Sequence, residues 1–153
     1  MLCMIMLLFS MMVSAQTNVA KPKVAKDTSA PKLVVKFGPY TDSSKTIISA
    51  MKQLLKNELK VTDSKGNAYT IVKFNFAWRK KDITDDFKTG IPKIIFIYNE
   101  ISVDSDAHIP ASWQKELQAS LQSKEELFFD EILVQNTKTK KLVKAPSLRL
   151  LVQ

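Results

Sequence analysis

The clearest pattern in the chain is an alternation of apolar and polar residues over positions 72–79. Val72, Phe74, Phe76 and Trp78 alternate with residues that are mostly polar. A period of two is typical of a strand that buries one face, and the three aromatic side chains indicate that this face lies in the core. The segment is therefore predicted to be a half-buried strand of an antiparallel sheet.

A first amphipathic helix is predicted before this strand. Its apolar residues recur at a spacing of three or four: Ile47, Ile48, Met51, Leu54 and Leu55. Residues 41–44 carry hydroxyl and carboxylate oxygens that can cap a helix N-terminus. The apolar stripe indicates a helix that covers a sheet, and a helix lying on a membrane surface is the alternative.

A second amphipathic helix is predicted after residue 108. Pro110 suits the first turn of a helix, because a backbone N–H has no helical partner there. Trp113, Leu117 and Leu121 then repeat at every fourth position, and the helix is expected to end near residue 123. The repeat places these three side chains on one face, which is expected to be buried.

The remaining apolar runs predict further strands. They are expected at residues 33–37, 94–98, 127–134, 142–143 and 148–152. Residues 94–98 are apolar on both faces, which indicates a central strand, whereas the charged residues 80–92 are expected to form a loop. The order of elements predicts an α+β fold, with a mainly antiparallel β-sheet or sandwich and two amphipathic helices.

The beginning of the chain has the pattern of a secretory signal peptide. An apolar run ends in small residues at Val13 and Ala15, which predicts a signal peptide over residues 1–15. An uncleaved anchor is the alternative, although a bilayer span needs roughly 20 apolar residues. Residues 16–32 lack an apolar period and are expected to form a flexible tether, followed by a single domain over residues 33–153. We therefore expect an exported protein with no membrane span after cleavage.

Composition indicates the kind of partner. The chain has 23 Lys and Arg against 15 Asp and Glu, a formal net charge of +8, which favours acidic partners or anionic surfaces. The lysines are scattered instead of gathered beside stacked aromatic residues, which argues against nucleic acid. One group lies in a predicted turn and strand near the end of the chain: Lys138, Lys140, Lys141 and Lys144. We expect these lysines to face an acidic protein of the cell envelope.

The inventory of reactive side chains is small for an enzyme. His108 is the single histidine, and the single cysteine lies within the predicted signal peptide. Asp104, Asp106 and His108 have a metal-like spacing, but the glycine and distal glutamate of a calcium loop are missing. A hydrolase built on Asp85, Asp86 and His108 is an alternative class. The sequence therefore predicts no catalytic site, no cofactor and no metal.

Four segments together resemble a known family. Residues 109–117 form a predicted helix opened by a proline, and residues 126–134 a strand with an aromatic-acidic-acidic-Ile motif. Residues 141–148 form a closing strand with a basic residue, a leucine and a proline, and residues 69–82 supply a preceding aromatic strand. This order resembles the C-terminal domain of the gliding-motility protein GldM family.

The resemblance implies a non-enzymatic protein-interaction module, because in that family the domain contacts partners within the type IX secretion and gliding machinery of Bacteroidota. Ser123 and Lys124 stand where the family usually has a glycine, and residues 137–139 replace its Asp-Gly turn, so both turns are expected to differ. Family members carry an inner-membrane helix and several periplasmic domains ahead of this one. We therefore expect a detached single-domain relative, located in the periplasm, at the outer membrane or outside the cell. The alternative function is a secreted domain that binds an anionic glycan or peptide.

Overall fold

The computed structural model describes residues 31–153. The predicted signal peptide, residues 1–15, and all but the last two residues of the predicted tether, residues 16–32, lie outside the described residues. Within residues 31–153, no helix is both long enough and apolar enough to cross a membrane.

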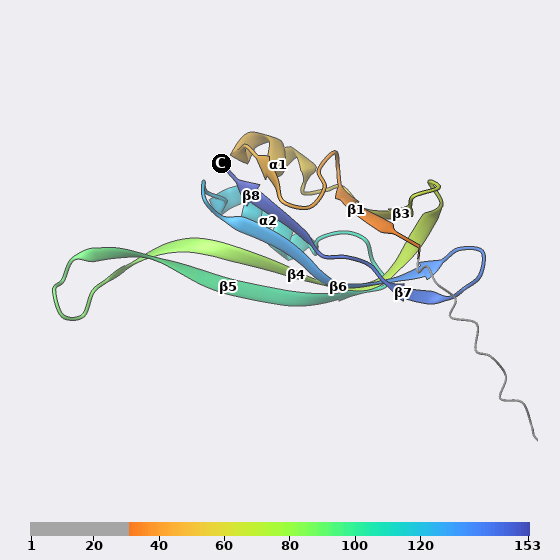
Figure 1. Ribbon diagram of the computed structural model, residues 1–153. Helices are drawn as coiled ribbons and strands as arrows, with labels where there is room; N and C mark the ends of the chain where they lie inside the picture. The colour runs from red at the N-terminus through yellow and green to blue at the C-terminus, as the bar shows by residue number, and fades with distance from the viewer. Residues whose placement is uncertain (1–30) are drawn as a thin grey trace, which may run out of the picture.

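Eight strands form one sheet, and two helices accompany it (Figure 1). The elements are β1 (Leu33–Phe37), β2 (Ser44–Thr46), α1 (Ile48–Leu54), β3 (Leu59–Asp63), β4 (Ala68–Asp85), β5 (Pro92–Asp104), α2 (Ala111–Ser120), β6 (Glu126–Asn136), β7 (Leu142–Lys144) and β8 (Leu148–Val152). The sheet has the order β1-β3-β4-β6-β8-β2, while β5 pairs with β4 and β7 pairs with β6. The strand pairs are antiparallel except for β2 and β8, which run parallel.

This is an α+β arrangement, as the sequence predicts. The expected sheet type is right only in part, because most strand pairs are antiparallel but one parallel pair makes the sheet mixed, and the strands form one curled sheet, not a sandwich. The parallel pair joins Ser44–Thr46 to residues 150–152. A strand of three residues has no period that sequence analysis can detect.

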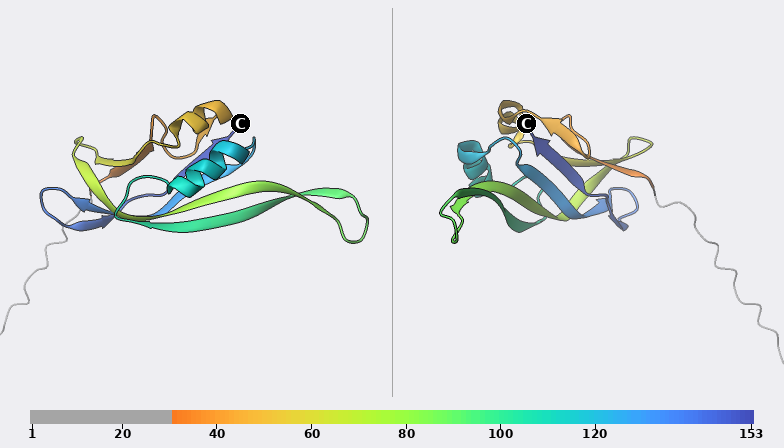
Figure 2. Two further views of the ribbon diagram at one scale, coloured as in Figure 1. Left: turned by 180° about the vertical axis from the view of Figure 1, so that it is seen from behind. Right: turned by 60° about the vertical axis from the view of Figure 1, so that its left-hand side comes forward.

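The core lies on the inner side of the curled sheet, where both helices pack (Figure 2). Phe74, Phe76 and Trp78 of β4 are buried, as the alternation predicts. The ring of Phe76 lies 5.5 Å from that of Trp113 on α2 and 5.2 Å from that of Phe129 on β6. Burial of each such side chain contributes about 1.5–3 kcal/mol to folding, so this aromatic cluster positions the sheet against α2.

A β-bulge in β6 explains how a charged residue is tolerated within this strand. Phe129 points into the core, but the next inward residues are Ile132 and Val134, so the alternation shifts by one position. The register between β4 and β6 is irregular at this point, and Glu131 has a φ of +51°. A bulge adds one residue to a strand. Glu131 therefore stays in solvent while Ile132 and Val134 are buried.

The two helices agree with the sequence to different degrees. Helix α2 begins after Pro110 and buries Leu117, as predicted, although it ends at Ser120 instead of near residue 123. Residues 41–44 do not cap α1, because Ser44 belongs to β2 and the N-cap position is Ile47, without a side-chain cap bond. Ile47 is 61% exposed, so the predicted apolar stripe is only partly buried.

The largest correction concerns residues 80–98. β4 continues to Asp85 and β5 starts at Pro92, so the predicted charged loop over residues 80–92 is mostly strand. Arg79 is the last residue of β4 that pairs with β6. Beyond it, β4 and β5 pair only with each other and project from the body as a two-stranded ribbon, which we call the arm, residues 80–98 (Figure 1). Residues 94–98 are therefore an exposed edge segment and not the predicted central strand.

Candidate interaction surfaces

The arm exposes an unusual amount of apolar surface. It contains seven of the nine large hydrophobic side chains that are exposed among residues 31–153: Ile83, Phe87, Ile91, Ile94, Phe96, Ile97 and Tyr98. Their combined exposure is roughly 800 Å², divided between the two faces and the tip of the arm. The largest exposed apolar patch on a monomer, typically about 300–600 Å², is often a functional surface.

The register of the hairpin divides the arm into two faces. Ile83 lies opposite Ile94, and Phe96 lies opposite Lys81. Directly opposed residues share a face, and this face is the one turned away from the buried aromatic side chains of β4. It continues onto the body through Tyr98, whose ring centroid is 5.7 Å from that of Phe128 on β6. We call this apolar band the outer strip; its members are Ile83, Ile94, Phe96, Tyr98 and Phe128.

Two arginines frame the outer strip at its base. The guanidinium carbon of Arg79 lies 4.0 Å from the ring centroid of Phe96, and that of Arg149 lies 5.7 Å from the ring centroid of Phe128. Arg79 donates to Glu126 Oε1 at 2.8 Å, and Arg149 donates to both carboxylate oxygens at 2.9 and 3.0 Å. The Glu126 side chain is only 7% exposed. Because both arginines are fixed beside aromatic rings, the strip has the composition of an interaction hot spot.

The pKa of the Tyr98 phenol depends on what surrounds the side chain. Partial burial raises the pKa of Tyr98, and the negative charges of Asp130 and Glu100 raise it further. Each of these causes disfavours the phenolate. Any partner that covers Tyr98 without bringing a cation should raise this pKa again, so the phenol titration can detect occupancy of the strip.

A buried carboxylate ties the arm to the body. Glu125 lies in the turn between α2 and β6 and is fully buried. Its side chain accepts hydrogen bonds from the Trp78 indole at 2.9 Å, the Lys81 backbone N–H at 2.8 Å and the Gln122 backbone N–H at 3.0 Å. The carboxylate thus joins the end of the core strand, the first residues of the arm and the turn after α2.

The predicted basic surface lies at the other end of the sheet. Lys138, Lys140 and Lys141 occupy the turn between β6 and β7, and Lys144 lies in β7; all four side chains are exposed. Lys144 Nζ lies 2.8 Å from Glu131 Oε1. The hydrogen bond from Lys144 lowers the pKa of the Glu131 carboxyl. Three of the four predicted lysines therefore share one exposed turn, whereas the charge of Lys144 is already compensated.

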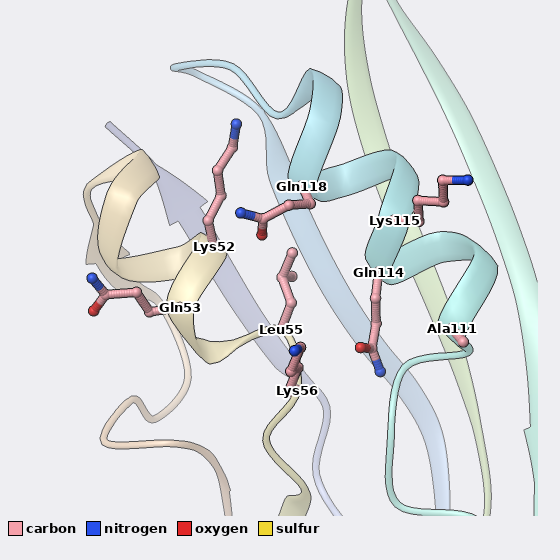
Figure 3. A pocket seen from close by; sticks show the side chains of 8 residues that line it. All are labelled: Lys52, Gln53, Leu55, Lys56, Ala111, Gln114, Lys115 and Gln118. Carbon is pink, nitrogen blue, oxygen red and sulfur yellow. The ribbon is translucent and has the colours of Figure 1, made fainter.

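A second basic surface was not singled out from the sequence. An open groove of about 590 Å³ separates α1 from α2 and is lined by residues including Lys52, Lys56 and Lys115. Three glutamines also line it, and no carboxylate does. Figure 3 shows that the side chains of Lys52 and Lys115 extend in different directions and that their amino groups do not converge. The groove is therefore electropositive but does not focus its charges on one position.

The structure separates the residues of the alternative hydrolase hypothesis. Of the residues with metal-like spacing, Asp106 and His108 are in contact, with Asp106 Oδ1 2.7 Å from His108 Nδ1. Asp104, just before them, pairs with Lys73 of β4, whereas Asp85 pairs with Pro92 at the other end of the hairpin. The twelve ladder steps between these register positions span roughly 40 Å. Asp85 and Asp86 therefore lie at the tip of the arm, far from His108. Among residues 31–153, no group of three or more His, Cys, Asp or Glu side chains is arranged around a metal position.

Sequence reasoning missed the arm as a functional region. The signal that could have identified it is the turn over residues 86–91, where the Gly90 N–H bonds to the Asp86 carbonyl and Gly90 has a φ of +65°. An aspartate and a glycine between two strand-like segments are typical of a hairpin. The charged residues around this turn favoured the prediction of a loop instead.

Comparisons with known proteins give no relative from which a function could be inferred. No protein-family model matches the chain, and no curated protein or solved structure matches it significantly. The structure is an α+β domain with a projecting two-stranded arm, whose outer face exposes apolar side chains beside two arginines.

Proposed function

We propose that the protein is an exported, non-enzymatic interaction module of the cell envelope that binds a protein partner through the outer strip of its arm. The observation that carries this proposal is the apolar exposure of the arm, with Arg79 and Arg149 held against its aromatic rings. Interfaces concentrate their binding energy in such aromatic and arginine side chains. The resemblance to the C-terminal domain of the GldM family supports the same class, as a detached single-domain relative.

The size of the arm fits the proposed role. The four arm members of the outer strip expose roughly 400 Å², about half of what each partner contributes to an interface of standard size, which fits a weak or transient contact. The ribbon projects from the body, so a partner can reach both its faces and the edges of β4 and β5 (Figure 2). The lysines at residues 138, 140 and 141 remain a predicted second contact for an acidic partner.

The test compares apolar side chains on the arm with matched side chains elsewhere. Ile83 and Ile94 are 65% and 55% exposed on the arm, while Ile47 and Leu142 are 61% and 52% exposed on the body. Replacement of either pair by serine should leave the melting temperature close to that of the wild type, because the side chains are already in water. Capture of a partner from an envelope extract should fall at least about tenfold for the arm pair and stay unchanged for the body pair. Equal capture by both variants would contradict the proposal.

A second function has its own supporting observation. The groove between α1 and α2 presents Lys52, Lys56 and Lys115 without a lining carboxylate, which suits an anionic glycan or an acidic peptide. Titration with a sulfated oligosaccharide should then give a signal that is lost in Lys52→Ala with Lys56→Ala and weakens with added salt. Binding that survives these substitutions would exclude the groove as the site.

A further inference from the structure

We propose that the arm binds the arm of a second copy of this chain, with outer strip against outer strip and the two ribbons antiparallel about a two-fold axis. This inference rests on the proposed function, since it names the partner of the same surface. It requires a surface that is complementary to itself, because in a two-fold dimer the same patch contributes both sides. The distribution of charge along the outer strip meets this requirement.

Arg79 and Asp85 stand at opposite ends of the outer strip and carry opposite charge. The base holds the cations Arg79 and Arg149, and the carboxylate that both arginines bind, Glu126, is nearly buried. The tip holds Asp85, which shares the face of Lys81 because the two lie four residues apart in a regular ladder. Among residues 31–153, Asp85 makes no side-chain hydrogen bond or ion pair. Its carboxylate is free to meet a cation from outside.

Other charges near the strip confine this difference to Arg79 and Asp85. Glu100 lies on the base face, where its Oε1 accepts a hydrogen bond from Asn75 Nδ2. At the tip, the positive charge of Lys88 offsets part of the negative charge of Asp85 and Asp86. The Asp86 side chain accepts hydrogen bonds from the backbone N–H groups of Lys88 and Thr89. Asp130 lies on the same face as Glu100 and also acts on the Tyr98 phenol. Glu100 and Asp130 offset the cations further along the base, so the complementary charges that remain are Arg79, which shares Glu126 with Arg149, and Asp85 at the tip.

An antiparallel arrangement matches charge and apolar surface at once. Arg79 and Asp85 are six residues apart on β4, a distance of roughly 20 Å along the strand. When a second ribbon lies antiparallel with its centre between these residues, its Asp85 faces Arg79, and the symmetry repeats the pair at the other end. The centre then falls at residue 82, between the cross-strand pair Lys81–Phe96 and the pair Ile83–Ile94. The first pair of one copy faces the second pair of the other, so Phe96 lies over Ile94 of the second copy.

The expected dimer is reversible. The four arm members of the strip, Ile83, Ile94, Phe96 and Tyr98, expose roughly 400 Å² per copy, which is below the roughly 800 Å² per partner of a standard interface. Small interfaces of this kind belong to weak and transient complexes, so we expect a dissociation constant on the order of ten micromolar.

A membrane is a less suitable occupant of this surface. Phe87 is fully exposed at the tip and could enter a lipid surface, but Asp85 and Asp86 directly precede it. Ionised carboxylates are costly to place in hydrocarbon. The same carboxylates contribute favourably when they face the arginine at the base of a second arm.

The test uses pairs of matched variants, in which one member alters the outer face of the arm and the other alters the opposite face. Phe96 and Ile97 are adjacent, equally exposed at 39%, and point to opposite faces. Asp85 and Asp82 are both exposed and also lie on opposite faces. Sedimentation velocity of the purified protein, over concentrations that bracket the expected dissociation constant, should show a dimer that weakens with salt. Phe96→Ser and Asp85→Arg should each weaken it by about tenfold or more, whereas Ile97→Ser and Asp82→Arg should change it less than about twofold. Melting curves of the four variants verify that each is folded.

The outcomes separate this inference from the proposed function. A dimer that responds only to the outer-face variants supports both, and a dimer that responds to both faces or to neither overturns the strip-to-strip arrangement. A monomer at all concentrations overturns the inference. If the protein is a monomer and the outer-face variants lose capture of another envelope protein, the proposed function stands without the dimer. If these variants still capture that protein, both the dimer and the proposed function fail. A monomer that binds anionic vesicles, and loses that binding in Phe87→Ser, makes a membrane the occupant and contradicts the inference.

Discussion

Removal of the Glu125 carboxylate should loosen the attachment of the arm. In Glu125→Ala the Trp78 indole loses its hydrogen-bond acceptor, and so do the backbone N–H groups of Lys81 and Gln122. Each buried donor left without a partner costs about 1–3 kcal/mol. The two backbone donors are partly buried and can be reached by water, so we expect a total loss of about 3–5 kcal/mol, from a stability that is typically about 5–15 kcal/mol for such a domain. Urea unfolding followed by tryptophan fluorescence should show a lower midpoint at an unchanged slope.

A neighbouring glutamate provides the control for this measurement. Glu116 forms an exposed ion pair with Lys80 at 3.2 Å, and Glu116→Ala should cost less than about 1 kcal/mol. A loss of less than about 1 kcal/mol in Glu125→Ala would refute the reasoning, because it would mean that water replaces the carboxylate at all three donors. Hydrogen exchange should also be faster at the Lys81 amide in Glu125→Ala and unchanged in Glu116→Ala.

Three further predictions concern the C-terminal hairpin. Lys140→Gly should raise the stability by about 0.5–1 kcal/mol, since Lys140 has a φ of +58° that glycine adopts without strain; an unchanged or lower melting temperature contradicts this. Lys144→Met should raise the pKa of Glu131 towards its ordinary value, which NMR titration of the carboxyl can follow. The folded-state pKa of Glu131 lies below its unfolded value, so the ionised carboxylate stabilises the fold above the unfolded pKa, and this stabilisation is lost as the pH falls through the folded pKa. The Lys144→Met variant should therefore lose less stability than the wild type on acidification. Lys140→Glu with Lys141→Glu should melt close to the wild type yet lose an acidic partner, and full retention of that partner at low salt means that the turn is merely solvated.

Much of the core could be predicted from the sequence because its patterns are local. Phe74, Phe76 and Trp78 alternate over a strand that buries one face, and Leu117 lies on a regular apolar face of α2. The bulge at Glu131 could not be predicted from the sequence, because it depends on how β6 pairs with β4. The same is true of the parallel β2–β8 pair, which joins segments about a hundred residues apart.

The candidate site was harder to predict, for a physical reason that the arm makes clear. A segment that is apolar on both faces, such as residues 94–98, has the composition of a buried strand, and that composition cannot distinguish burial in the same chain from burial against a partner. The surface lysines of residues 138–141 were found because charge is visible in composition. The outer strip could be recognised only when the register placed Ile83, Ile94 and Phe96 on one exposed face.

The continuity of β4 has a consequence for how the domain moves. One uninterrupted strand runs from the core, where Phe74 is buried, to the exposed tip at Asp85. Its amides before Arg79 are held by neighbours on two sides, while those beyond have β5 alone. Opening of the tip should therefore require much less free energy than opening of the core, so that exchange rates rise along a single strand. Occupation of the arm would slow exchange at the tip while leaving the core amides unaffected, and the protein could thus bind and release at one end without disturbing its fold.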